Sequence, residues 1–171
     1  MKPAAIGLLV VAMALSSCTS GPDAPDAAPV NRVCADTFCI TMPAGWTAET
    51  GPDYISANHS SAPESTFLTA GVINMEAIVQ AAGGTWPATT DVVSRSFWTL
   101  LEEAGVGTFA RSARMLGGAE RSWGTHDDGD MWHLVYPTGP TSAIGIELRA
   151  PNDSWESHAD TVFESVDLKN S

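Results

Sequence analysis

The fold is decided by the stretch AERSWGTHDDGDMWHLVYPTGPTSAIGIELR, residues 119–149. It contains three runs of alternating apolar and polar residues, separated by the turn signals Asp128-Gly129 and 137–141. An Asp-Gly pair between alternating runs is a strong signal for a two-residue hairpin turn. The stretch therefore predicts three consecutive antiparallel strands, over 119–126, 130–136 and 142–149.

The alternation also predicts which side chains share a face of this sheet. If Asp127 lies opposite Asp130 across the first turn, then Trp123 lies opposite Leu134. The second turn then places Leu134 opposite Ile144. Both turns agree on one apolar face, and a slip by one residue would expose it. This expected core face carries Trp123, Trp132, Leu134, Ile144, Ile146 and Leu148.

The opposite face carries the candidate chemical residues His126, His133 and Glu147. In this register His133 lies between Gly124 and Gly145, and His126 is its diagonal neighbour. Two imidazoles and a carboxylate could bind a metal ion or act as an acid–base pair, so a metal-assisted enzyme is one alternative. Equally, the glycines could let a helix pack closely while His133 bonds to a backbone carbonyl. We expect no tight binding of zinc or copper.

Motifs of common enzyme classes do not occur in the chain. It has no G-x-S-x-G, no H-E-x-x-H and no phosphate-binding loop. The acidic run 127–130 lacks the ligand spacing and closing Glu of a calcium loop, so we interpret it as a hairpin turn. We therefore assign no catalytic residue and no cofactor, and we expect a non-enzymatic protein.

The remaining segments predict an α+β protein. Apolar positions 93, 97, 100, 101 and 104 have the spacing of an amphipathic helix that begins near Thr90 and ends at Gly105. A second helix with similar spacing is predicted after Pro151. We expect a mostly antiparallel sheet of about six strands, packed with these two main helices. Further strands are predicted at 38–42, 54–59, 66–75 and 108–115.

The first residues are typical of an export signal. Lys2 precedes a short apolar run, and Leu15-Ser16-Ser17-Cys18 resembles the bacterial lipobox, in which the cysteine is acylated. We predict a lipoprotein signal peptide at 1–18, a Pro-rich tether at 19–32 and a single globular domain at 33–171. Acyl chains on Cys18, such as palmitate, would hold the protein to the extracytoplasmic side of the cell membrane. An ordinary signal peptide with an incidental cysteine, or a buried apolar helix, is the alternative.

Composition limits the partners that this protein could bind. Its formal net charge of −12 argues against nucleic acid and against electrostatic docking on anionic lipids. Beyond the lipid anchor, the expected partner is therefore an envelope protein or a small ligand. In an exported protein, Cys34 and Cys39 are expected to form a disulfide.

Six tryptophans are many for a chain of 171 residues. Trp86 lies in the segment 83–87, which has no apolar periodicity, and Trp98 lies beside the predicted apolar stripe of its helix. These two are the candidates for partner contact, and burial between loop and helix is the alternative. Tryptophans along an apolar groove would also suit a carrier of lipid or glycan, which is a further alternative function.

The segment ITMPAGW, residues 40–46, resembles the opening strand and P-x-G-W turn of PsbP-like domains. A closing helix that ends near FESV, residues 163–166, is also similar to that family. This resemblance implies an α/β/α sandwich and an accessory, partner-binding role, and it implies no catalytic residues. We therefore expect a membrane-anchored exported lipoprotein with a PsbP-like binding domain.

Overall fold

The computed structural model describes residues 31–116, 118–126 and 129–169. Its strands are β1 (Asn31–Cys34), β2 (Phe38–Met42), β3 (Trp46–Thr50), β4 (Tyr54–His59), β5 (Phe67–Asn74), β6 (Ala110–Leu116), β7 (Ala119–His126), β8 (Gly129–Pro137), β9 (Ser142–Ala150) and β10 (Asp167–Leu168). Its helices are α1 (Met75–Ala81), α2 (Thr90–Glu103) and α3 (Glu156–Glu164), with a 3-10 turn, η1 (Asp153–Trp155).

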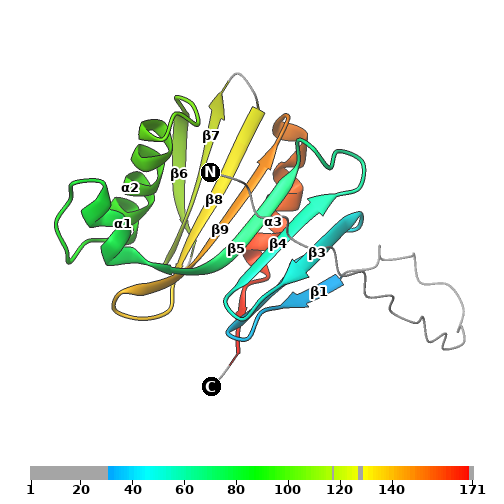
Figure 1. Ribbon diagram of the computed structural model, residues 1–171, viewed down its shortest axis with the longest axis horizontal. Helices are drawn as coiled ribbons and strands as arrows, with labels where there is room; N and C mark the ends of the chain where they lie inside the picture. Colours follow the sequence, from blue (N-terminus) through cyan, green and yellow to red (C-terminus); the bar gives the residue numbers. More distant parts are fainter. Residues whose placement is uncertain (1–30, 117, 127–128, 170–171) are drawn as a thin grey trace, which may run out of the picture.

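The main sheet has seven antiparallel strands in the order β3-β4-β5-β9-β8-β7-β6 (Figure 1). A second, three-stranded sheet has the order β1-β2-β10. The expectation of about six strands was too low, since the described residues form ten. The missed strands β1, β3 and β10 have two to five residues each, too few for a periodic pattern to stand out.

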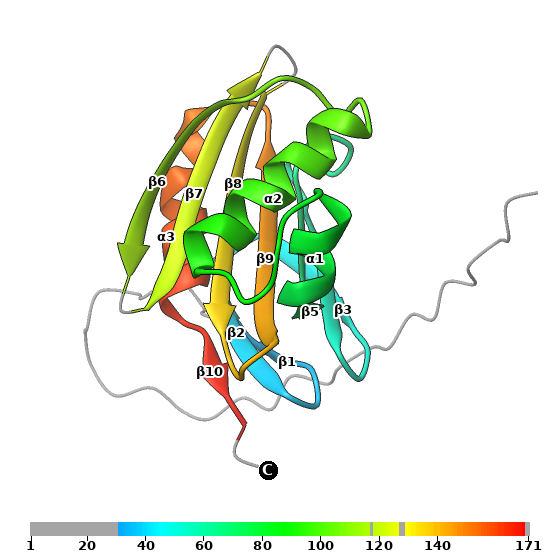
Figure 2. The same cartoon turned by 90° about the vertical axis from the view of Figure 1, so that its left-hand side faces the viewer.

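The domain has helices on both faces of the main sheet, as expected for an α/β/α sandwich. Helix α2 lies over β7 and β8 and contacts α1, while α3 packs against β2 and β8. Figure 2 shows α1 and α2 in front of the sheet and α3 behind it. The α1/α2 face and the α3 face of the main sheet are therefore distinct environments.

The predicted faces of the central strands are confirmed, but the predicted register is wrong by two residues. Trp123 pairs with Trp132, not with Leu134, and Leu134 pairs with Ile146, not with Ile144. The last pair between β7 and β8 is His126 with Gly129, one residue before the predicted pair of Asp127 with Asp130 on each strand. A shift of two residues keeps every side chain on its face, because side chains alternate with a period of two.

The predicted apolar face forms part of the main core on the α3 side of the sheet. Five of its six members are buried, and Trp123 is partly buried against them. The same cluster includes Phe38 and Ile40 of β2 and Val162 and Phe163 of α3. Burial of apolar surface between β8, β9 and α3 thus holds the layers together.

The N-terminal part of the domain contains the predicted disulfide. Cys34 and Cys39 are bonded, and they are also paired across the β1–β2 hairpin. Strand β1 begins at Asn31, so the last two residues of the expected tether belong to a strand. Cys18, the rest of the predicted signal peptide and residues 19–30 of the predicted tether lie outside the described residues. Among the residues that the structure describes, no helix is long and apolar enough to span a membrane.

Candidate functional site

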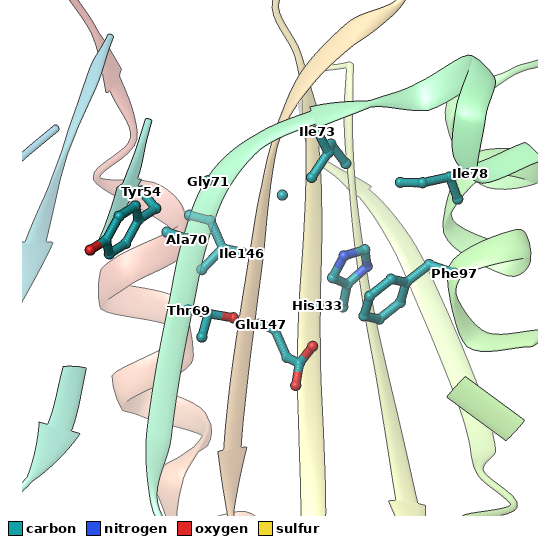
Figure 3. A pocket seen from close by; sticks show the side chains of 11 residues that line it. Tyr54, Thr69, Ala70, Gly71, Ile73, Ile78, Phe97, His133, Ile146 and Glu147 are labelled. Carbon is teal, nitrogen blue, oxygen red and sulfur yellow. The ribbon is translucent and has the colours of Figure 1, made fainter. Parts of the chain in front are cut away.

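A pocket of about 270 Å³ opens on the α1/α2 face of the main sheet (Figure 3). Strands β4, β5, β8 and β9 form its base, and Ile78 of α1 and Phe97 of α2 form one wall. Its base includes Thr69, Gly71, Ile73, His133, Gly145 and Glu147. The pocket therefore combines apolar walls with the polar side chains of Thr69, His133 and Glu147 from the neighbouring strands β5, β8 and β9.

Two glycines open this hollow. Gly71 of β5 and Gly145 of β9 are directly paired, so the sheet has no side chain at either position. A Cβ at Gly145 would lie 2.9 Å from Cγ2 of Ile73, and one at Gly71 would lie 3.2 Å from the carbonyl oxygen of Asp53. Larger residues here would crowd the pocket walls.

His133 is buried at the base of the pocket, with 2% of its surface exposed. Its ring stacks on Phe97 with a centroid distance of 3.7 Å, and its Nδ1 has no hydrogen-bond partner among the described residues. Burial, together with the positive charge of Arg111, lowers the pKa of His133 to about 3. The imidazole is therefore neutral at physiological pH and can donate one hydrogen bond and accept another.

Glu147 is the second polar residue of the pocket. It pairs with His133 on β8 and with Thr69 on β5. Its Oε1 accepts a hydrogen bond of 2.5 Å from Nε of Arg149, whose guanidinium lies 5.3 Å from the Phe67 ring centroid. The ion pair offsets the charge of Glu147 beside the apolar part of the pocket.

The third residue of the predicted chemical set does not join the other two. His126 pairs with Gly129, four residues along β8 from His133, which corresponds to ~13 Å along the strand. The prediction that His126 neighbours His133 diagonally is wrong, because the two-residue shift moves it away. No group of three potential metal ligands occurs among the described residues. Metal-assisted chemistry by His126, His133 and Glu147 therefore has no geometric support.

The two tryptophans proposed for partner contact have different environments. Trp98 is only 3% exposed, and its indole donates a hydrogen bond of 2.9 Å to Oγ of Ser122. Trp98 is therefore not a candidate for partner contact: it is buried, the alternative that the sequence left open, because Gly124 and Ser122 on β7 leave room for the indole beneath α2. Trp86 is partly buried against the small cluster that contains Val79. It thus keeps some exposed surface next to α1.

An aromatic cluster that the sequence did not predict lies on the other side of the domain. Trp46, His59, Trp155 and His158 lie together, and the indole of Trp46 donates a hydrogen bond of 3.0 Å to Nδ1 of His158. Burial and the nearby His59 lower the pKa of His158. These residues come from three separate segments, so only the P-x-G-W turn before β3 marked one of them.

Comparisons with known proteins identify the fold. No family model matches the chain, and no curated protein matches it in sequence. The solution structure of cyanobacterial PsbP (CyanoP) from Synechocystis sp. PCC 6803 matches with a TM-score of 0.55 and 16% identity, over 88% of this chain and 98% of that one. The domain has a PsbP-like fold.

A second similar structure is that of LpqN, described as involved in cell envelope biogenesis of Mycobacterium tuberculosis. It has 15% identity and a TM-score of 0.45, over 84% of this chain and 87% of that one. A fold by itself does not specify a function, so the function of this domain has to be argued from its own pockets.

Proposed function

We propose that this chain is an exported, lipid-anchored binding protein of the cell envelope, and that its PsbP-like domain takes a small, mostly apolar ligand in the pocket on the α1/α2 face. The observation that carries the proposal is the hollow between the paired glycines and Phe97, with His133 and Glu147 at its base. Concave apolar sites with few polar groups are typical of ligand-binding pockets.

The polar side chains of the pocket suit recognition better than catalysis. His133 is uncharged near pH 7 and only a weak base, since its pKa is lowered to about 3. Glu147 is paired with Arg149, so it is not a free base. A neutral imidazole and a carboxylate that is already paired can orient one polar group of a ligand, while Ile73, Ile78 and Phe97 cover its apolar body.

The ligand site is tested with n-alkanols of increasing chain length, followed by nuclear magnetic resonance. Each added methylene that enters the pocket contributes about 0.8 kcal/mol, so the affinity should rise about fourfold per carbon until the pocket is full. Gly145→Val should abolish this gain, because the new side chain pushes Ile73 into the hollow. Ser112→Val, an exposed change on edge strand β6, is the control.

Two outcomes would contradict the site. One is an affinity that does not depend on chain length. The other is a Gly145→Val protein that is folded and still binds decanol like the wild type. Either result would contradict ligand binding in this pocket, and neither would change the description of the fold.

The anchor is tested separately by intact mass spectrometry of the protein extracted from membranes of its native host. We expect a mature chain that begins at Cys18 and carries acyl chains, and we expect the Cys18→Ser variant to be missing from the membrane fraction. An unmodified mass, or a chain that begins elsewhere, would contradict lipid anchoring.

A further inference from the structure

A second pocket lies on the opposite face of the main sheet, next to the beginning of α3. Its volume is about 230 Å³. In Figure 1 the end of β7, the start of β8 and the start of α3 lie at the same end of the domain. The lining residues are Trp123 and Thr125 of β7, Asp130 and Trp132 of β8, Asp153 of η1 and Glu156 of α3.

The strands bring two kinds of side chain to this pocket in register. Trp123 pairs with Trp132, and Thr125 pairs with Asp130, so all four lie on one face of the β7–β8 hairpin. Trp132 is buried and Trp123 is partly buried. The pocket therefore has two indoles next to a carboxylate, and the 3-10 turn η1 adds a second carboxylate from Asp153.

The charge of the pocket is entirely negative. Asp130, Asp153 and Glu156 line it, and none of its six lining residues is cationic. Glu156 already accepts a hydrogen bond of 3.0 Å from Arg121. Asp130 has no such partner in the described part of the chain: it is 9% exposed, its Oδ1 is buried without a hydrogen bond, and it belongs to no ion pair.

A buried carboxylate oxygen without a hydrogen-bond donor destabilises the folded protein. A bound cation would offset this destabilisation. A metal ion fits poorly, because the described residues contain no cluster of three close metal ligands. Organic cations fit better, since ammonium and guanidinium groups combine hydrogen bonds to carboxylates with favourable contact to indole rings. Their alkyl stems also pack against aromatic surface.

We propose that this second pocket, lined by Trp123, Asp130, Trp132 and Asp153, binds an ammonium or guanidinium group on an alkyl stem. Such a group occurs in a small free amine and in a lysine or arginine side chain of a partner. Asp130 supplies the buried acceptor, Asp153 the outer carboxylate, and the indoles cover the stem. The proposal does not depend on the apolar pocket, which lies on the other face of the sheet.

The test is a titration of the full-length mature protein at low ionic strength with two probes. Cadaverine represents a free amine, and Nα-acetyl-lysine-N-methylamide represents a side chain within a polypeptide. Binding is followed through the indole N–H signals of Trp123 and Trp132. We expect Asp130→Asn to weaken binding at least tenfold, and Asp153→Asn to weaken it a few-fold. Asp36→Asn, which removes an exposed carboxylate outside the pocket, should change it less than twofold.

Stability gives a second readout that simple charge attraction would not move. Asp130→Asn removes the unpartnered carboxylate, so the free protein should melt at a higher temperature. The affinity of the same variant for the probe should fall. If Asp130→Asn fails to fold, Asp153→Asn still tests the site, because Asp153 is exposed. Tighter binding of the blocked lysine would indicate a partner's side chain, and tighter binding of cadaverine would indicate a small solute.

Three results would overturn the proposal. One is the absence of any change in the two indole signals with either probe at 10 mM. Another is an equal loss of binding in Asp130→Asn and Asp36→Asn. The third is calcium ions perturbing the same signals with the affinity of cadaverine, which would show an unselective acidic surface.

Discussion

The two faces of the main sheet are built from the same strands with different chemistry. On the α3 face, Leu134 of β8 and Ile146 and Leu148 of β9 are almost fully buried in the main core. On the α1/α2 face, the same strands present His133, Gly145 and Glu147. Because side chains alternate along a strand, one pair of strands supplies both the core and the base of the ligand pocket.

The helices that cover these faces are held in different ways. Helix α3 packs Val162 and Phe163 into the apolar core. Beneath α2, Oγ of Ser122 lies 3.0 Å from Oγ of Ser94 and accepts from the indole of Trp98, both buried contacts. Hydrophobic burial is therefore concentrated on the α3 face, whereas small and polar residues on the α1/α2 face leave room for a ligand.

The largest expected effect is the loss of a core side chain on the α3 face. Leu148→Ala should lower the free energy of unfolding by about 4 kcal/mol, because Leu148 is fully buried and its removal leaves a cavity. Ile73→Ala, on the other face, should cost about 1 kcal/mol, since Ile73 is only partly buried and borders an open pocket. Urea unfolding measures both, and equal losses would contradict the contrast between the faces.

The next effect is a pH dependence that belongs to the α1/α2 face. The pKa of His133 is about 3 in the folded protein and ordinary when unfolded, so the unfolded state takes up the proton first. Stability should therefore fall as the pH drops below about 6.5, by on the order of 3 kcal/mol by pH 4. His133→Leu should remove this part of the pH dependence in urea unfolding. An unchanged profile in that variant would contradict the burial of a neutral imidazole.

Ser122→Ala tests the polar contacts beneath α2. It leaves the indole of Trp98 and the hydroxyl of Ser94 without their shared partner, which should cost about 2 kcal/mol. Ser112→Ala, an exposed change on the neighbouring edge strand, should stay within about 0.5 kcal/mol. If the two variants unfold at the same urea concentration, the hydrogen bonds do not stabilise the docking of α2.

The smallest expected effect is the difference in stability between alanine substitutions at two glycines on the α1/α2 face. A Cβ at Gly124 would lie 2.9 Å from Cβ of Phe109 and 3.0 Å from Cζ3 of Trp98, both packed in the cluster beneath α2. Gly124→Ala should therefore cost about 1–2 kcal/mol. Gly145→Ala should cost less than about 1 kcal/mol, because Ile73 can turn into the pocket. Thermal unfolding should rank them in this order, and the reverse order would mean that the pocket is as tightly packed as the helix contact.

Local sequence determined the longer elements of this protein and the faces of its central strands. The alternation over 119–149 identified three strands and correctly separated Leu134 and Ile146 from His133 and Glu147. The apolar spacing after Thr90 predicted α2, and the ITMPAGW segment indicated the PsbP-like fold. These features depend on side-chain direction within one element, which the residue pattern alone can specify.

Tertiary structure decided which residues meet. The register of β7, β8 and β9 differs from the predicted one by two residues, a shift that leaves the apolar pattern unchanged and therefore invisible in the sequence. That shift separates His126 from His133, and close packing over Gly124 buries Trp98. Both pockets arise where separate elements meet around glycines or an unpaired carboxylate. Their positions follow from the packing of whole elements, which no local pattern along the chain encodes.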